Sequence, residues 1–143
     1  MIEVRLACST EMEQLFAIRR EVFVRGQGVP IDREIDGLDG DATHFIAVIG
    51  DKTIGTARLR VVDGHAKVER VAVREPWRGC GAGSRLMDAV ECHARAIGLT
   101  EVVLSAQVAV IPFYERRGYA AHGPVFEDAG IAHRSMHKTL CRE

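Results

Sequence analysis

The fold is decided by the stretch Val71-Ala72-Val73-Arg74-Glu75-Pro76-Trp77-Arg78-Gly79-Cys80-Gly81-Ala82-Gly83-Ser84-Arg85-Leu86. It begins as an apolar strand, passes through three glycines at alternate positions and enters a helix. Glycines let the backbone approach a ligand closely and adopt dihedral angles that other residues avoid. The first N–H groups of a helix have no intrahelical partner, and the positive end of the helix dipole lies behind them. The stretch therefore predicts a phosphate or pyrophosphate site at a helix N-terminus.

Two common phosphate-binding motifs do not match this stretch. A P-loop requires Lys-Ser or Lys-Thr after its last glycine, and neither follows here. The dinucleotide fingerprint requires a third glycine at the position that Ser84 occupies. What remains is the pattern R-x-x-G-x-G, formed by Arg78, Gly81 and Gly83 directly after an apolar strand.

The chain before this stretch predicts one strand, one helix, a long loop and three more strands. Alternation of apolar residues indicates a strand over 2–6. Thr10 and Glu13 have the spacing of a capping box, and the apolar period behind them indicates a helix to about Val24. The Gly- and Asp-rich segment 25–42 is expected to be a long loop. Successive strands are expected at 45–49, 53–62 and 66–73, and short turns between them indicate an antiparallel meander.

The chain after the stretch predicts alternating helices and strands. The helix that opens at Gly83 has an apolar stripe and is expected to end before Gly98, placed at the C′ position. A buried strand over 102–104 and a short helix over 112–117 follow, and a final strand pair includes Tyr119 and 135–140. The elements predict an α/β (α+β) fold, with a single mixed, largely antiparallel twisted sheet flanked by helices.

Composition limits the class of protein. A length of 143 residues predicts a single domain over 1–143. A net charge of −1 and scattered cationic residues argue against a nucleic-acid partner. No apolar run approaches about 20 residues, so we expect no membrane partner and a cytoplasmic location. The four cysteines, Cys8, Cys80, Cys92 and Cys141, are expected to be free thiols.

A second motif, together with the glycine-rich stretch, resembles a known protein family. The segment Ala109-Val110-Ile111-Pro112-Phe113-Tyr114-Glu115-Arg116-Arg117-Gly118-Tyr119 follows the loop at a suitable distance. Together the two motifs resemble the GNAT superfamily of acetyl-CoA-dependent N-acetyltransferases. The resemblance implies a GNAT-like acyl-CoA N-acyltransferase fold, acetyl-CoA as the acetyl donor without a metal, and a possible homodimer.

The first half of the chain resembles a subset of small bacterial members of that family. The residues that carry this likeness are Val22-Phe23-Val24-Arg25-Gly26-Gln27-Gly28-Val29-Pro30, followed by Glu34, Asp36, Asp39 and His44. That subset often has a glutamate where this chain has Gly26. The resemblance places the acceptor site at Gln27, Glu34, Asp36, His44 and His133.

The resemblance also implies which residues hold the cofactor. The pantetheine arm should pair with the backbone of the strand that contains Val71, Ala72 and Val73, much as an added strand would. The pyrophosphate should lie on the backbone N–H groups of Gly79, Cys80, Gly81, Ala82, Gly83 and Ser84. A charge-assisted contact would come from Arg78. Gln107 and Phe113 complete the expected cofactor site.

Two side chains are expected to take part in the chemistry. Tyr114 matches the family's general acid, and a phenol has a pKa suited to protonating a thiolate leaving group. Its alternative role is that of an aromatic residue packed on a short helix. Glu69 lies on the strand that leads into the loop, where some members place a base acting through water. A solvent-facing strand carboxylate is the alternative.

Two further patterns leave alternatives open. The acidic segment containing Asp32, Glu34, Asp36, Asp39 and Asp41 would attract a cationic amine, or would simply be a solvated loop. His133 and His137, with Cys141 beyond them, have a spacing found in zinc sites. They lack the accompanying Glu base or a second cysteine pair, so no metal site is predicted.

The sequence therefore predicts an N-acetyltransferase that uses a small-molecule or peptide amine as acceptor. The expected reaction is direct attack of the amine in a ternary complex. One alternative is a coenzyme-A-binding regulatory module without catalysis. Another is a phosphate- or nucleotide-binding protein of a different class. The acceptor itself is not specified, because acceptor pockets are built from variable loops.

Overall fold

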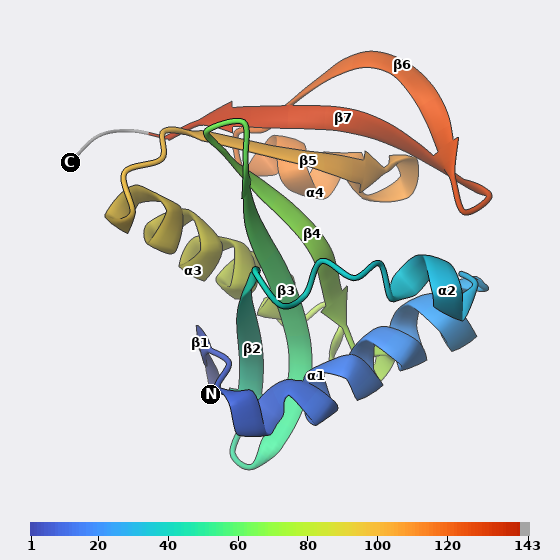
Figure 1. Ribbon diagram of the computed structural model, residues 1–143, viewed down its shortest axis with the longest axis vertical. Helices are drawn as coiled ribbons and strands as arrows, with labels where there is room; N and C mark the ends of the chain where they lie inside the picture. The colour runs from blue at the N-terminus through green and yellow to red at the C-terminus, as the bar shows by residue number, and fades with distance from the viewer. Residues whose placement is uncertain (141–143) are drawn as a thin grey trace.

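Seven strands form one sheet in a computed structural model that describes residues 1–140 (Figure 1). Their order across the sheet is β1-β2-β3-β4-β5-β7-β6. Only β4 and β5 run parallel among these residues, so the expected mixed and largely antiparallel sheet is confirmed. The strands are β1 (Ile2–Leu6), β2 (Thr43–Ile49), β3 (Lys52–Val62), β4 (His65–Val73), β5 (Glu101–Gln107), β6 (Ala120–Asp128) and β7 (Ile131–Thr139).

The helices connect these strands and cover the sheet. The α-helices are α1 (Met12–Arg19), α2 (Ile31–Glu34), α3 (Ala82–Ala96) and α4 (Ile111–Arg116). Shorter or wider helical segments adjoin them: η1 (Ser9–Glu11), the π-helical η2 (Arg20–Arg25), η3 (Glu75–Trp77) and η4 (Val108–Val110). None of the helices in residues 1–140 has the length and apolarity needed to cross a membrane.

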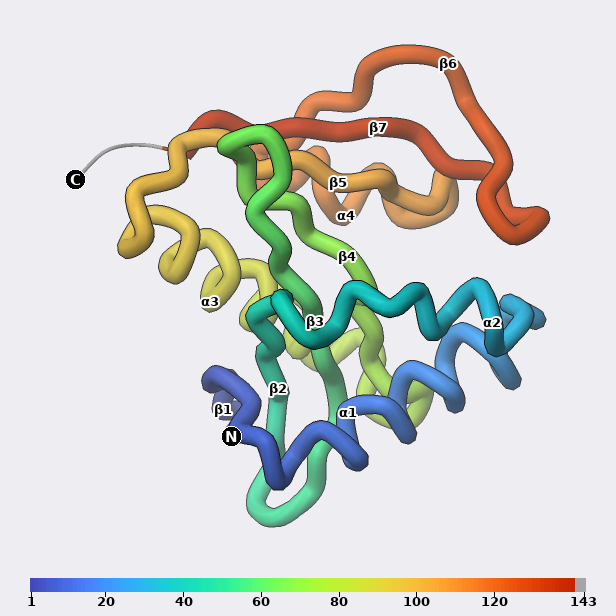
Figure 2. The backbone as a smooth tube through the Cα atoms, viewed as in Figure 1, coloured from blue at the N-terminus to red at the C-terminus, as the bar shows by residue number. Residues whose placement is uncertain are grey.

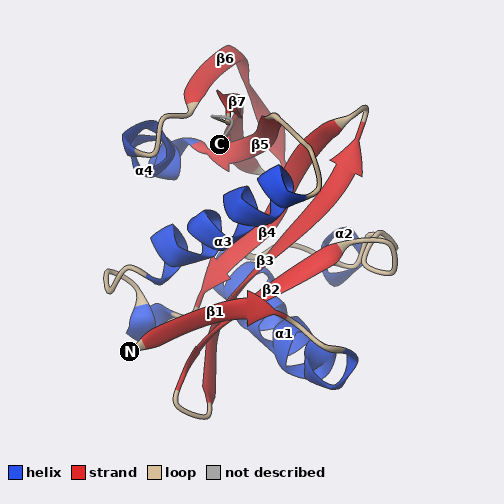
Figure 3. Cartoon of the chain, turned by 90° about the vertical axis from the view of Figure 1, so that its left-hand side faces the viewer, coloured by secondary structure: helices blue, strands red, loops and turns tan. Residues whose placement is uncertain are grey.

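The two long helices lie on opposite faces of β2, β3 and β4 (Figures 1 and 3). The apolar stripe of α3 is fully buried against one face: Leu86, Met87, Val90 and Ala94. On the other face, α1 and η2 bury Leu15, Ile18 and Val22. Burying one large aliphatic side chain contributes about 1.5–3 kcal/mol. The periodic apolar residues of each helix thus determine which side of the helix packs against the sheet.

Two sequence predictions in the first half are corrected. The capping box is formed by Cys8 and Glu11, two residues earlier than expected, and the Glu11 carboxylate accepts a hydrogen bond from the Cys8 N–H at 3.0 Å. The 3-10 turn η1 therefore precedes α1, and Thr10 lies inside it. The segment 25–42 is not entirely loop, since α2 begins directly after Pro30. A proline there suits a helix start, because its missing N–H would have no intrahelical partner.

A bulge and a divergence in the middle of the sheet create the site. On β3, Thr56 pairs with Ala72 and Arg58 pairs with Glu69, so Arg70 and Val71 of β4 both oppose a single residue. Arg70 has φ +57° there, which costs a non-glycine residue about 1–2 kcal/mol. Such a bulge bends its strand. The pairing of β4 with β5 runs only from Ala66–Val68, and beyond it the two parallel strands separate.

Candidate active site

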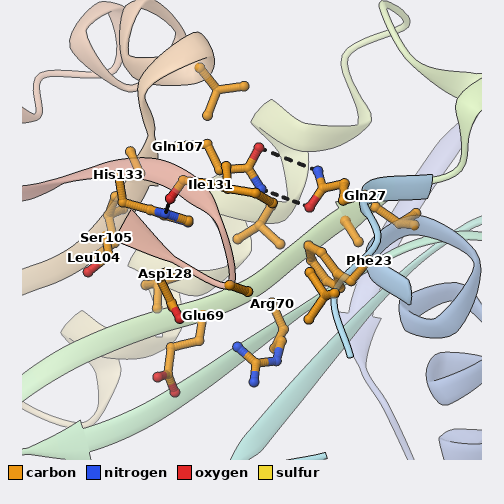
Figure 4. A pocket seen from close by; sticks show the side chains of 18 of the residues that line it. Phe23, Gln27, Glu69, Arg70, Leu104, Ser105, Gln107, Asp128, Ile131 and His133 are labelled. Carbon is orange, nitrogen blue, oxygen red and sulfur yellow. Dashed lines mark hydrogen bonds between the residues drawn. The ribbon is translucent and has the colours of Figure 1, made fainter. Parts of the chain in front are cut away.

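A cleft of about 480 Å³ opens where β4 and β5 separate. Its walls come from the ends of those strands, from η2 and α2, and from the hairpin between β6 and β7 (Figure 4). Ten of the residues predicted for the site line this cleft: Gln27, Glu34, Glu69, Val71, Ala72, Val73, Arg78, Gln107, Tyr114 and His133. A concave, mixed apolar and polar space of this size suits a ligand.

The strand expected to pair with the pantetheine arm forms one wall of the cleft. Val71 and Val73 are partly buried and pack on the core, while their backbone borders the gap left by β5. The Nε of Arg78 donates a hydrogen bond to the carbonyl of Val73 at 2.9 Å. This contact places the Arg78 guanidinium between the strand end and the glycine loop.

The glycine loop lies beside the cleft and leads into α3. Gly79 has φ +79° and Gly81, the N-cap residue, has φ +91°, so both adopt a conformation that favours glycine. A side chain at Gly83 would meet the Phe113 ring at 3.5 Å. Within the loop the Cys80 thiol donates to the Trp77 carbonyl at 2.6 Å. The geometry gives the N-terminus of α3 the open backbone that an anion site requires.

Replacing Gly81 by valine is expected to weaken coenzyme-A binding at least about tenfold, because a β-branched residue resists a positive φ and would rebuild the loop. Isothermal titration with coenzyme A measures the effect. Gly64 is a matched control, since it has φ +77° on the β3–β4 hairpin, outside the cleft and the loop. Gly64→Val should lower stability and leave the coenzyme-A affinity unchanged. Equal affinities of the two variants would contradict the role of the loop.

Tyr114 is positioned by α4 at the wall of the cleft. Its side chain is buried, and its ring packs edge-on against those of Phe113 and Tyr119. Burial raises the pKa of Tyr114 to about 12, because the charged phenolate is poorly solvated there. The hydroxyl therefore carries its proton at neutral pH, which a general acid requires.

Glu69 lines the cleft but is held by two arginines of β3. Its carboxylate accepts from Arg60 Nε at 2.6 Å and from Arg58 Nη2 at 3.0 Å. Burial alone would raise the pKa of Glu69, yet these arginines outweigh it and hold the pKa below its ordinary value. Glu69 is therefore ionised at neutral pH and has a low affinity for a proton.

The acidic segment folds back over the sheet and pairs with the chain's own arginines. After α2 the chain crosses β4 and β3 (Figure 2), and Asp36 accepts from Arg58 at 2.7 and 2.9 Å. Arg58 also donates to Asp39 at 3.0 Å. These hydrogen bonds, those from Arg58 first, lower the pKa of Asp36. Asp36 and Asp39 are therefore paired with arginines and are not freely solvated carboxylates, and their role toward an amine stays a prediction.

Glu34 belongs to the same network at its buried end. Its carboxylate accepts from Arg19 Nε at 2.8 Å, and Arg19 also binds Asp39 at 2.7 Å. Its other oxygen lies 2.7 Å from Arg70 Nε, an ionic contact whose angle is poor for a hydrogen bond. Arg70 further contacts Asp36 at 3.2 Å. The network therefore holds Arg70 in its left-handed conformation and fixes the bulge.

The remaining acceptor-site predictions divide into two groups. Gln27 and Gln107 exchange two hydrogen bonds, at 2.9 and 3.4 Å, across the cleft (Figure 4). His133 lines the cleft, with Nδ1 2.7 Å from the carbonyl of Ile131. His44 lies elsewhere, buried on β2 with Nε2 3.0 Å from the carbonyl of Asp39, so it supports the acidic segment and does not border the cleft.

The histidine spacing that suggested zinc falls on a strand. His133 and His137 are both on β7. Residues four apart on a strand are about 13 Å apart, too far for two imidazoles to share an ion. No cluster of metal-binding side chains occurs within residues 1–140. Cys8, Cys80 and Cys92 are free thiols, as expected, and Cys141 lies outside the described residues.

The arginines that bind the carboxylates of the site were not predicted from the sequence. Arg58 and Arg70 lie on central strands, and the side chain of Arg58 is 0% exposed. A charged residue within an apolar strand is rarely buried without a partner. Arg58, between Ala57 and Leu59, was therefore a signal that carboxylates lie nearby.

The fold and the site together define a class of protein. Parallel strands that separate beside a glycine-rich helix N-terminus, within a seven-stranded mixed sheet, are the arrangement of acyl-CoA N-acyltransferases. An acyl-CoA N-acyltransferase from Pseudomonas aeruginosa superimposes with a TM-score of 0.86 at 29% identity, covering 97% of this chain and all of that one. Escherichia coli ElaA superimposes with a TM-score of 0.84 at 29% identity, covering 96% and 99% of the two chains.

Sequence comparison identifies the family. The profile of the acetyltransferase (GNAT) domain matches residues 17–140. The uncharacterized N-acetyltransferase YjcF of Bacillus subtilis is 38% identical over 129 residues, covering 90% of this chain and 92% of the relative. The chain belongs to the GNAT acetyltransferase family, and it is an acyltransferase.

Proposed function

We propose that this protein transfers an acetyl group from acetyl-CoA to a primary amine, by direct attack within a ternary complex. The observation that carries the proposal is the cleft between β4 and β5. The cleft contains a free strand edge for pantetheine and the protonated Tyr114 hydroxyl, and a helix N-terminus for the pyrophosphate lies beside it. These are the three requirements of thioester aminolysis: a bound donor, a positioned carbonyl and an acid for the leaving group.

The amine nitrogen attacks the thioester carbon, a C–N bond forms, and the C–S bond breaks with its electron pair leaving on sulfur. Tyr114 donates its proton to the departing thiolate. Burial disfavours the Tyr114 phenolate, so the proton stays on the hydroxyl until the thiolate forms beside it. A backbone N–H near Val73 would stabilise the carbonyl oxygen.

Glu69 remains the proposed acceptor of the amine proton, acting through water. Because its arginine partners keep its pKa low, it would pass the proton on to solvent and remain ionised, and a proton from solvent would restore the Tyr114 hydroxyl. The rate should therefore rise with pH according to the deprotonation of the acceptor amine itself. In this proposal Glu69 orients the water and supplies a fixed negative charge.

Thermal melting with acetyl-CoA, coenzyme A, ATP and NAD tests the donor site. A ligand at about 100 times its dissociation constant adds roughly 2.7 kcal/mol and raises the Tm of a domain of this size by several degrees. We expect both coenzyme-A compounds to stabilise the protein and both nucleotides to leave its Tm unchanged. Thiol release with a panel of amines then tests transfer. Coenzyme-A binding without turnover on any amine would favour a regulatory module instead.

A further inference from the structure

The charges around the acceptor side of the cleft do not balance. Five cations contact four carboxylates there: Arg19, Arg58, Arg60, Lys67 and Arg70 against Glu34, Asp36, Asp39 and Glu69. The other charged pair at this end, Arg33 and Asp128, is neutral in itself, with 2.6 Å between its charged atoms. One positive charge is therefore left in excess.

Lys67 carries that excess. Its Nζ lies 4.0 Å from Glu69, whose carboxylate already has two closer arginine partners. The Lys67 side chain is 37% exposed, against 16% for Glu69 and 2% for Glu34. The ammonium of Lys67 is thus the most exposed charge of this network. Arg33 and Asp128 also line the cleft on this side and are more than half exposed, but they pair with each other.

This arrangement repels a second cation and attracts an anion. The Glu69 carboxylate already binds Arg58 and Arg60. An acceptor ammonium at Glu69 would therefore compete with these arginines and would lie beside Lys67. Like charges placed together in a binding site cost affinity, and opposite charges guide both binding and specificity. Lys67 precedes Val71 by four residues, and the bulge in β4 makes their separation shorter than the roughly 13 Å of a regular strand. An anion at Lys67 would consequently be several bonds away from a reacting amine.

We propose that the acceptor is an amine whose molecule also carries an anionic group, a carboxylate or a phosphate, which Lys67 binds. The inference rests on the proposed function, because it names the acceptor of that same reaction. It disfavours polyamines and other purely cationic amines. In this proposal the acidic segment does not bind the acceptor amine, because its carboxylates bind the arginines of the sheet.

Matched acceptor pairs test the proposal. Glucosamine 6-phosphate is compared with glucosamine, and glycylglycine with glycylglycinamide, by thiol release from acetyl-CoA at one pH. In the peptide pair the distant amide has little effect on the amine, so the comparison isolates the carboxylate. We expect kcat/KM to be at least about fivefold higher for one anionic member, mainly through KM. The pair that shows the preference tells whether phosphate or carboxylate is recognised. Equal or higher values for both uncharged members would overturn the proposal.

Substitutions test whether Lys67 causes the preference for the anionic acceptor. Lys67→Gln should abolish this preference and Lys67→Arg should retain it. Lys52→Gln removes the same charge from an exposed position at the start of β3, outside the cleft lining, and should leave the preference intact. The preference should also shrink at high salt, which a purely structural role would not produce. An unchanged preference in Lys67→Gln would overturn the assignment.

Binding separates this proposal from the proposed function. The same amines are titrated calorimetrically into the protein saturated with coenzyme A, so that no turnover is needed. Tighter binding of the anionic member, lost in Lys67→Gln, would support the inference even if no amine were acetylated. Acetylation with spermidine preferred over every anionic amine would support amine transfer and overturn the inference.

Discussion

Replacing Tyr114 by phenylalanine is expected to lower kcat by about 100-fold, the lower end of what a positioned general acid contributes. The variant keeps the buried ring and its edge-on contacts, so the fold and the acetyl-CoA affinity should change little. Only the proton for the thiolate is lost. Steady-state kinetics with an active amine and calorimetric titration of acetyl-CoA measure the two effects.

Tyr119→Phe is the matched control for this prediction. Tyr119 is also buried and contacts the Tyr114 ring, but it does not line the cleft, and its hydroxyl donates to Glu91 at 2.8 Å. Its loss should cost about 1.5–3 kcal/mol of stability, as for a hydrogen bond to a charged group, and leave kcat near the native value. If Tyr114→Phe and Tyr119→Phe had equal kcat, Tyr114 would have no part in the mechanism.

The pH dependence adds a second test of Tyr114. Burial raises its pKa to about 12, so its proton stays in place across the neutral and mildly alkaline range. The kcat of the native protein should therefore show no alkaline decline from this residue below about pH 10. A decline with an apparent pKa near 8 that disappears in Tyr114→Phe would contradict this environment for the hydroxyl.

Replacing Arg58 by methionine is expected to destabilise the protein by about 3 kcal/mol, the lower end of the cost of breaking a buried ion pair, because the partly buried carboxylates around it would each keep only one other arginine partner. The Arg58 side chain is 0% exposed and donates to three of them, Asp36, Asp39 and Glu69. Such a loss is a large fraction of the total stability of a small domain. Urea unfolding at pH 7 measures it.

Arg60→Met serves as the control for Arg58→Met. Arg60 donates only to Glu69 among the described residues, and its side chain is 21% exposed. Solvent screens such a pair, so the variant should lose about 1 kcal/mol or less. If Arg58→Met and Arg60→Met lost similar amounts of unfolding free energy, burial of Arg58 would not explain its contribution to stability.

The effect of Arg58→Met should depend on pH in a defined direction. Hydrogen bonds from Arg58 lower the pKa of Asp36, and arginines also outweigh burial to lower the pKa of Asp39 and Glu69. Carboxylates with lowered folded-state pKa values stabilise the fold above their unfolded values, about 3.9 and 4.3, and this contribution is lost as pH falls further. The free energy of unfolding of the native protein should therefore fall below about pH 4. The difference in free energy of unfolding between the native protein and Arg58→Met should become smaller there. A difference that widens on acidification would contradict the network.

Much of the architecture followed from local patterns in the sequence. Alternating apolar residues predicted β1 and the meander of β2, β3 and β4, and the helical stripe of α3 predicted its buried face. Gly98 and Gly118, with φ of +88° and +92°, end helices where the sequence indicated. These signals are readable because a side-chain period and a glycine conformation depend on neighbours in the chain.

The sequence by itself determined the family, the order of the elements and the glycine loop at the start of α3. The tertiary structure decided how the site is charged and where it opens. Arg58 reaches Asp36 across 22 positions, and Arg70 reaches Glu34 across 36, so no local period reveals these pairs. The bulge at Arg70 and the separation of β4 from β5 likewise arise when distant segments meet. The physical reason is that buried charges must find partners in space, wherever the chain supplies them.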